Sequence, residues 1–385
     1  MISSDKYRSL ATARDRFRSL AIARDDVQSL IRRAWVEVDL GALRRNAAAI
    51  AARAGVPILP MVKADAYGLG AVRIARALEE DDPWGFGVAT VTEGEELRRA
   101  GITRPIIVFT PMMAEELDGA ERSNLTPALA TAATIKRWSE TQLPWHLDIE
   151  TGMGRAGLRW DEVNTLQDLL AKFPPAGAFT HFHSAELSNG SMEEQTRRFD
   201  EALRGLPVRP TILHAENSAA IERCGRSRWS FARPGVFLYG VNNIRDTGFR
   251  AEPVTSLRAR IVEMRSMRDG ETVGYDGTWT ARGRRRIATV PVGYADGYRR
   301  ILGNRGMGIL RGRRVPVAGN VTMDMTMFDV TEVPCEIGDV VTMIGADGDE
   351  SISVSDIAEL GQLSPYEVLT SLRSRLPRRY HSGEA

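Results

Sequence analysis

The stretch PMVKADAYGLG, residues 60–70, ends a short apolar run on a lysine and turns sharply after it. Lys63 closes the run, Tyr67 follows four residues later, and Gly68 and Gly70 permit a tight turn. In a barrel of parallel strands, residues at the carboxyl ends of the strands face the active site. The stretch therefore predicts a functional lysine at a strand end, if similar strands surround it.

Further apolar runs follow in the same rhythm, and segments with helical spacing separate them. Together with the first run, the strand candidates are PILPMVKA, GFGVAT, PIIVF, TPALA, WHLDIE, AGAFTHF, TILHAE and FARPGVFLYG. Strands that alternate with helices predict parallel βαβ units, and this number of units favours a closed (β/α)₈ barrel of the TIM type within an α/β fold. A doubly wound open sheet is the alternative.

The barrel pattern occupies residues 34–253, and the segments on either side differ from it. After residue 253, short runs are rich in Val, Ile and Thr and are separated by Gly, Asp and Pro. These runs are IATVPVGYADGY, RVPVAGNV, TMFDV and DVVTMIG. This texture predicts a mainly β C-terminal domain over residues 254–385. Residues 1–33 contain the near-repeat RSLATARD and RSLAIARD, which predicts an amphipathic helical extension.

The composition is that of a soluble protein, since 43% of the 385 residues are hydrophobic and 26% are charged. A formal net charge of +1 gives no field that would select nucleic acid or a membrane surface, and no apolar run could cross a bilayer. The first residues lack the apolar core of a signal peptide. Cys224 and Cys335 have no metal-type spacing. We therefore expect a cytoplasmic protein with reduced thiols, no metal site, and no nucleic-acid or membrane partner.

Polar residues recur at the predicted carboxyl ends of the later strands. They are Arg155 after the fifth strand, His181 at the end of the sixth, Asn217 and Ser218 after the seventh, and Arg233, Gly235 and Val236 at the eighth. Each could singly be a surface cation or a strand cap, but together they would lie on one rim. The loops after strands seven and eight are the usual phosphate site of such barrels. There the Ser218 hydroxyl, the Gly235 backbone and the Tyr67 hydroxyl could donate hydrogen bonds.

Lys63 gains a role from this phosphate site. Partial burial and neighbouring cations would lower the pKa of its amine from ~10.4. A neutral amine can form a Schiff base with a carbonyl group. A lysine of this kind opposite a phosphate site indicates pyridoxal 5'-phosphate as the cofactor.

Several motifs in their order along the chain resemble those of the alanine racemase family of fold-type III pyridoxal phosphate enzymes. The matching segments are VKADAYGLG, HLDIETGMGRAGL, FTHF, ENSAA, RPGVFLYG, VGYDGTW, VPVGYADGY and VTMDM, and the resemblance covers about residues 35–380. It implies an amino-acid racemase, with alanine as the expected substrate, that supplies a D-amino acid as a peptidoglycan precursor. It also implies a head-to-tail homodimer with shared active sites, in which the opening strand WVEVD (35–39) joins the β domain.

The resemblance assigns two bases to racemisation, one on each face of the substrate. Lys63 resembles the lysine that holds the cofactor and serves one face. Tyr275, in VGYDGTW, resembles the second base, which reaches across from the other subunit. A phenol with a pKa of ~10 is a usable base only where neighbouring cations favour the phenolate.

The remaining roles are carried over from the same resemblance. Tyr67, Ser218, Gly235 and Val236 look like the phosphate contacts, and Asn217 lies among them. Arg155 resembles the arginine near the cofactor's phenolic oxygen and the substrate carboxylate, and the Met323 backbone resembles a carboxylate contact from the other subunit. Arg233 would face the pyridine nitrogen with support from His181, and would leave that nitrogen unprotonated because arginine only donates. Supporting positions are Asp148, Tyr294, Asp324 and Ser374.

Three positions depart from the family's pattern. Asp148 stands where a carbamylated lysine usually fixes the arginine matched by Arg155. Ser374 stands where a tyrosine narrows the substrate pocket, although Tyr366 or Tyr380 could fill that space instead. Asn320 stands where an entrance-lining arginine is common. A racemase for serine or for a broader range of amino acids is therefore the alternative function.

Two other classes of pyridoxal phosphate protein are weighed against the racemase. A non-catalytic cofactor-binding protein would need no second base, so the β domain with Tyr275 and Met323 argues against it. A decarboxylase of the same fold type is disfavoured because the chain lacks its C-terminal cysteine motif.

Overall fold

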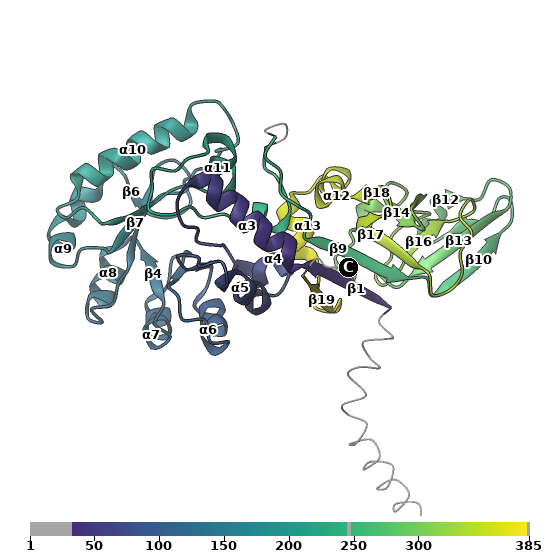
Figure 1. The fold of residues 1–385 in the computed structure, drawn as a ribbon, viewed down its shortest axis with the longest axis horizontal. Helices are drawn as coiled ribbons and strands as arrows, with labels where there is room; N and C mark the ends of the chain where they lie inside the picture. Colours follow the sequence, from purple (N-terminus) through teal and green to yellow (C-terminus); the bar gives the residue numbers. More distant parts are fainter. Residues whose placement is uncertain (1–32, 245–247, 383–385) are drawn as a thin grey trace, which may run out of the picture.

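The structure is a computed structural model that describes residues 33–244 and 248–382. The expected helical extension over residues 1–33 lies outside the described residues, except for its last residue. Figure 1 shows a helix-covered parallel sheet at one end of the molecule and a β-rich part at the other. The α/β class and the two-part architecture predicted from the sequence are both present.

Six parallel strands form the curved sheet of the first part, in the order β2-β3-β4-β5-β7-β8. Their bounds are Phe86–Val88 (β2), Ile106–Val108 (β3), Thr126–Leu129 (β4), His146–Glu150 (β5), Gly177–Phe179 (β7) and Ile212–His214 (β8). A two-residue strand, β6 (Leu158–Arg159), pairs with β5. Each strand of the curved sheet corresponds to one of the predicted runs, and β2, β3, β4 and β7 are buried along their whole length, as strands covered on both faces should be.

The first and last predicted strands close the ring, although they do so through isolated bridges. Residues 57–62 lie between β2 and residues 231–234, because Val62 N donates to Gly87 O at 2.9 Å and Leu59 N donates to Ala232 O at 2.7 Å. Arg233 N completes the circuit by donating to Glu216 O at 2.9 Å, beyond the end of β8. Pro57, Pro60 and Pro234 have no backbone N–H, which limits the ladder that these two segments can form. The predicted barrel is confirmed, and the open-sheet alternative is wrong.

Helices follow the strands and cover the outside of the ring. They are α3 (Leu40–Ala54), α5 (Ala71–Glu79), α6 (Val91–Arg99), α7 (Ala114–Arg122), α8 (Ala132–Ser139), α9 (Gln167–Lys172), α10 (Ser191–Gly205) and α11 (Ser218–Cys224). The first illustrates why the sequence forms these elements. Asp39 caps α3 by accepting from Ala42 N at 2.9 Å, and Gly55 ends it at a φ of 68°.

The second part is built on a large mixed sheet of order β15-β14-β17-β9-β1-β19, to which β18 adds at β17. Its strands are β1 (Ala34–Asp39), β9 (Thr255–Arg260), β14 (Met307–Leu310), β15 (Arg313–Pro316), β17 (Val340–Asp347), β18 (Glu350–Ile352) and β19 (Arg378–His381). A smaller sheet contains β10 (Glu263–Met267), β13 (Arg285–Val290) and β16 (Thr326–Asp329), and a hairpin pairs β11 (Thr272–Val273) with β12 (Trp279–Thr280).

The two parts are joined at the middle of the molecule. Strand β1 lies in the large β sheet, parallel to β19 and antiparallel to β9, and leads directly into the barrel helix α3. Helices α12 (Val354–Gly361) and α13 (Pro365–Ser371) precede β19, and α13 packs against the Lys63 turn (Figure 1). Residues from the end of the chain therefore reach the rim of the barrel.

Candidate active site

A cavity of about 360 Å³ opens at the carboxyl ends of the barrel strands. Its lining contains most of the residues that the sequence placed on one rim: Lys63, Tyr67, Asp148, Arg155, His181, Asn217, Ser218, Arg233, Gly235 and Val236. They come from loops after different strands, so the closed ring is what brings them together.

Lys63 begins a turn with a rare backbone conformation. The four residues after it, Ala64 to Tyr67, have φ angles of 53°, 53°, 50° and 58° and so form a left-handed helical turn, α4 (Lys63–Gly68). Left-handed backbone costs L-residues about 1–2 kcal/mol each, so the turn stores roughly 4–8 kcal/mol of strain. Gly68 and Gly70 also have positive φ angles, as a tight turn at these glycines requires, and the four preceding non-glycine residues extend the left-handed backbone beyond what was predicted.

Contacts from both parts of the molecule hold this turn. Ala66 N donates to Val62 O at 2.8 Å, and the Asp65 carboxylate accepts from Ala71 N at 2.7 Å. The C-terminal strand contributes as well, since Arg378 Nη2 donates to Gly68 O at 2.6 Å and the Tyr380 hydroxyl donates to Leu69 O at 2.9 Å. Tyr380 therefore supports the turn and does not line the cavity.

The Lys63 amine sits in surroundings that favour its neutral form. Burial lowers its pKa, and the positive charges of Arg155 and Arg233 lower it further, whereas Glu93 opposes them. A neutral amine is the form that can attack a carbonyl carbon or accept a proton. The expected lowering of the Lys63 pKa by burial and neighbouring cations agrees with this arrangement.

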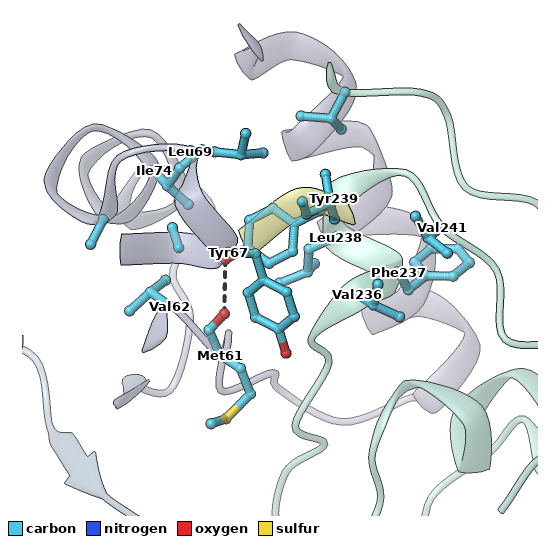
Figure 2. Close-up of a cluster of buried hydrophobic side chains, with 14 of the residues drawn as sticks. Met61, Val62, Tyr67, Leu69, Ile74, Val236, Phe237, Leu238, Tyr239 and Val241 are labelled. Atoms are coloured by element: carbon cyan, nitrogen blue, oxygen red, sulfur yellow. Dashed lines mark hydrogen bonds between the residues drawn. The ribbon is translucent and has the colours of Figure 1, made fainter. Parts of the chain in front are cut away.

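Three hydrogen-bonding groups lie close together in the cavity wall. Gly235 N donates to Ser218 Oγ at 2.8 Å. A side chain at Gly235 would place its Cβ only 2.4 Å from the Tyr67 hydroxyl oxygen, so the glycine allows the phenol to approach the backbone. Figure 2 shows the Tyr67 ring packed against Tyr239, whose hydroxyl donates to Met61 O at 2.8 Å. Hydroxyls and a backbone N–H in one corner form a suitable cradle for a phosphate group.

Arg233 is buried and anchors a directed chain of hydrogen bonds. Its Nη1 lies 2.6 Å from His214 Nδ1, and its Nη2 donates to Thr180 O at 2.7 Å. Because arginine only donates, His214 Nδ1 must accept, which leaves the hydrogen of His214 on Nε2. That Nε2 lies 2.8 Å from His146 Nδ1 and can donate to it. The expected support from His181 is weaker, since its Nδ1 lies 3.4 Å from Arg233 Nη2.

The charges around Arg233 follow from this burial. Desolvation, reinforced by the charge of Arg233, lowers the pKa of both His146 and His181 to about 3 and keeps these rings neutral. Burial also lowers the pKa of Arg233, to about 10, which leaves the guanidinium charged at neutral pH. His146 and His214 were not predicted as site residues. The sequence could have indicated them, because each histidine lies in an apolar run that was predicted to be a strand of the same parallel sheet.

Asp148 and Arg155 both line the cavity. Burial raises the pKa of Asp148 to about 7, and Arg233 and Arg155 only partly offset that effect. Within the residues that the structure describes, no ion pair joins Asp148 to Arg155. Its role in fixing Arg155 therefore stays a prediction.

Five of the predicted residues lie outside this cavity. All five lie on the β-rich part of the chain. Three of them have largely exposed side chains: Tyr275 (67%), Met323 (53%) and Tyr294 (40%). The other two are Asp324 and Ser374. Asp324 pairs with Arg375 at 2.8 Å, and Ser374 is exposed. Asn320 holds the Tyr275 loop, since its Nδ2 donates to Tyr275 O at 3.0 Å. The sequence analysis expected Tyr275 and Met323 to enter the barrel cavity of a second subunit. Their roles therefore remain predictions.

Unlike Ser374, Tyr366 of α13 lines the cavity. Its ring centroid lies 5.9 Å from that of Tyr67, and its hydroxyl donates to Asn243 Oδ1 at 3.1 Å. Glu222 holds Asn243 in turn, by accepting from its side-chain amide at 2.7 Å. Of Tyr366 and Tyr380, the two tyrosines weighed as replacements for the aromatic side chain missing at Ser374, Tyr366 is the one that lines the cavity.

Comparison with known proteins agrees with the geometry. The model of the alanine racemase N-terminal domain matches residues 38–243, and that of the C-terminal domain matches residues 254–380. The chain belongs to the alanine racemase family. This family consists of pyridoxal phosphate-dependent isomerases, so the class of enzyme expected from the sequence is confirmed.

Individual alanine racemases match almost end to end. The alanine racemase of Halothermothrix orenii is 36% identical over 373 residues, which cover 91% of this chain and 97% of that protein. The alanine racemase of Sorangium cellulosum is 37% identical over 376 residues, with 91% and 99% covered. The crystal structure of alanine racemase from E. faecalis superimposes with a TM-score of 0.86 at 30% identity, covering 91% and 98% of the chains. A structure from Bartonella henselae, described with covalently bound pyridoxal phosphate, gives 0.82 at 27% identity, covering 91% of this chain and all of that one.

The residues of this alanine racemase relative fit that cofactor. Lys63 supplies an amine of lowered pKa, the corner of Ser218, Gly235 and Tyr67 supplies donors for a phosphate, and Arg233 supplies a fixed positive charge.

In the described part of the chain, no helix combines the length and the apolar character that a membrane span requires. The same residues contain no group of three or more His, Cys, Asp or Glu side chains that could hold a metal ion.

Proposed function

We propose that this chain interconverts L-alanine and D-alanine with pyridoxal 5'-phosphate held on Lys63. The observation that carries the proposal is that Lys63 lines the same cavity as the Ser218, Gly235 and Tyr67 donors. When bound, the cofactor withdraws electrons from the substrate's α-carbon and makes its proton acidic. The 34–37% identity to proteins named alanine racemase supports alanine as the substrate.

The protein's own groups would then bind the substrate and move its proton. Once the substrate amine has replaced Lys63 on the cofactor, the free Lys63 amine, whose pKa is lowered, would remove the proton from one face of the α-carbon in one direction of the reaction and would donate a proton to that face in the other direction. Tyr275 of a second copy serves the opposite face. Arg155 offers a guanidinium to the substrate carboxylate from the cavity wall. Arg233 stays charged and donates only, so it supplies no acceptor that would stabilise a protonated pyridine nitrogen.

A homodimer with shared active sites accompanies this proposal. Tyr275, Tyr294, Met323 and Met325 are large apolar side chains that are 40% or more exposed on the β-rich part of the described chain. Exposed large apolar side chains, where they form one patch, mark surfaces that bind another protein, and this supports the proposal. We also propose that the enzyme works in the cytoplasm, where an unmodified thiol at Cys335 is expected.

The test uses purified protein, L-alanine and heavy water. Proton NMR should show loss of the α-proton signal, and optical rotation should fall to zero as D-alanine accumulates. Borohydride treatment of the yellow protein should fix the cofactor onto the peptide that contains Lys63. Retained optical rotation with no α-proton exchange would refute the proposed activity, and an adduct on another lysine would refute the role of Lys63.

Serine is the second substrate to include in the same assay. Ser374 motivated a wider range, but Tyr366 occupies the cavity wall and reduces the free space. The position of Tyr366 therefore favours alanine over larger amino acids. Activity on L-serine similar to that on L-alanine would reverse this preference.

A further inference from the structure

Glu93 stands at the start of helix α6, where it takes part in a capping box. The Thr90 hydroxyl accepts from Glu93 N at 3.3 Å, and Glu93 Oε2 accepts from the backbone N–H of Thr90 at 3.3 Å. Oε2 also accepts from Ala89 N at 2.7 Å. These contacts satisfy amides at the helix start, which is the ordinary purpose of such a box.

The second oxygen of Glu93 binds a different element. Oε1 accepts from Ala64 N at 2.7 Å, and Ala64 is the residue directly after Lys63 and the first of the left-handed turn. The matching acids at the starts of α7, α12 and α13 contact only their own helix start: Glu116 accepts from Met113 N at 2.9 Å, Asp356 from Ser353 N at 2.7 Å, and Glu367 from Ser364 N at 2.9 Å. Among these boxes, Glu93 is therefore the one that reaches the lysine turn.

The charges around Lys63 make this contact chemically relevant. Arg155 and Arg233 face Lys63 with positive charge, and His181 faces it as a neutral ring. Glu93 is the anion that acts on Lys63 against the two arginines. A carboxylate in this place favours the ammonium form of the lysine, and its bond to Ala64 N fixes the backbone from which the side chain projects.

We propose that Glu93 is a positioning residue for Lys63, which holds the lysine turn at the cavity and balances the charge of its amine. The inference deepens the proposed function, because it takes Lys63 as the residue that carries the cofactor. Glu93 itself does not line the cavity and is not assigned a contact with substrate.

The test measures the reactivity of Lys63 in cofactor-free protein. The chain has only four lysines, and Lys136 and Lys172 are exposed, so they provide internal references for isotope-labelled reductive methylation followed by peptide mass spectrometry. In Glu93→Gln, the midpoint of the Lys63 modification profile should move to lower pH by roughly one unit, because the opposing charge is lost. The affinity for added pyridoxal phosphate should fall about three- to tenfold, the scale of one hydrogen bond.

Three further variants separate positioning from helix stability. Glu116→Gln removes the matching acid of α7 and should leave both the Lys63 profile and the cofactor affinity unchanged. Thr90→Ala weakens the α6 cap but keeps Glu93 and should leave the Lys63 midpoint unchanged. Glu93→Asp keeps the charge on a shorter side chain, so it should weaken cofactor binding while the midpoint stays nearer to that of the parent.

Two results would overturn the inference. One is a Glu93→Gln protein whose Lys63 midpoint and cofactor affinity equal those of the parent. The other is a Thr90→Ala protein that shifts the midpoint as far as Glu93→Gln, because the effect would then come from the helix start alone. A borohydride adduct on a different lysine would instead refute the proposed function, and the profile in cofactor-free protein would still decide the role of Glu93.

Discussion

Asp148 shows at the scale of one residue how burial sets chemistry. Its carboxyl group lines the cavity, and desolvation raises its pKa to about 7 despite two arginines. An unfolded aspartate titrates near pH ~3.9. Between these two values the folded chain binds the extra proton, so the free energy of unfolding should fall as pH rises from about 4 to about 7 and then level off.

The change Asp148→Asn tests this sign. The variant cannot titrate at this position, so its free energy of unfolding should lose the Asp148 contribution to the decline between pH 5 and pH 8. Urea unfolding of cofactor-free parent and variant at both pH values measures the difference. An equally steep decline in the variant would show that Asp148 ionises normally in the folded chain.

Tyr366 and Ser374 lead to opposite predictions about the range of substrates. Tyr366 lines the cavity, whereas Ser374 is exposed on the described chain. Tyr366→Ala should raise kcat/KM for L-serine relative to L-alanine by about tenfold to a hundredfold, the range expected when pocket volume changes by a few carbon atoms. Ser374→Ala should leave that ratio unchanged.

Ser374→Tyr is the complementary variant, because it introduces the tyrosine that the resemblance led us to expect at this position. If Tyr366 already closes the pocket, this change should leave the serine-to-alanine ratio within about threefold of the parent, well below the tenfold effect of a pocket change. A strong narrowing of the range by Ser374→Tyr would show that Ser374 faces the substrate in the assembled enzyme.

At the scale of elements, the phosphate corner depends on two segments that approach very closely. Gly235 lies beside the end of the lysine turn, and a Cβ there would meet the Tyr67 hydroxyl oxygen at 2.4 Å. Gly235→Ala should therefore displace Tyr67 and weaken binding of pyridoxal phosphate about tenfold or more, since one hydrogen bond is lost and its neighbour is disturbed.

Tyr67→Phe provides the control for this clash. Phenylalanine lacks the hydroxyl that a Cβ would strike, so Gly235→Ala should cost much less affinity in a Tyr67→Phe background than in the parent. Cofactor titrations of the parent, both single variants and the double variant give the coupling directly. Additive losses would contradict a direct clash between the two positions.

At the scale of the whole molecule, the two proposed bases lie on different parts of the chain. Lys63 lines the barrel cavity, and Tyr275 is exposed on the β-rich part. If a second copy supplies Tyr275, inactive Lys63→Ala and inactive Tyr275→Phe proteins should regain partial activity when their subunits exchange. Hybrid dimers would then contain one site in which both bases are intact.

Random exchange limits the expected recovery. Half of the dimers are hybrids, and each hybrid has one intact site of two, so racemisation should return to about a quarter of the parental rate per site if sites act independently. Mixing two preparations of the same variant gives the baseline. No recovery after mass spectrometry has verified hybrid dimers would argue against shared sites.

Much of this arrangement could be predicted from local sequence patterns. The alternation of apolar runs and helical segments predicted the barrel, because burial on both faces of a parallel sheet requires continuous apolar strands. Strand ends then located Lys63, Ser218 and Arg233 on one rim, since parallel strands carry their carboxyl ends to the same edge. The motifs around these residues resembled one family, which the comparisons confirmed.

Tertiary structure alone decided which distant groups meet. The link from Arg233 through His214 to His146 joins three segments of the ring, and Glu93 reaches Ala64 from another helix. The left-handed turn after Lys63 contradicts local backbone preference and persists because Arg378 and Tyr380, more than 300 residues away, hold its end. Local patterns report the preferences of neighbouring residues, whereas a strained turn and a chosen hydrogen-bond partner depend on contacts that form only when the whole chain is folded.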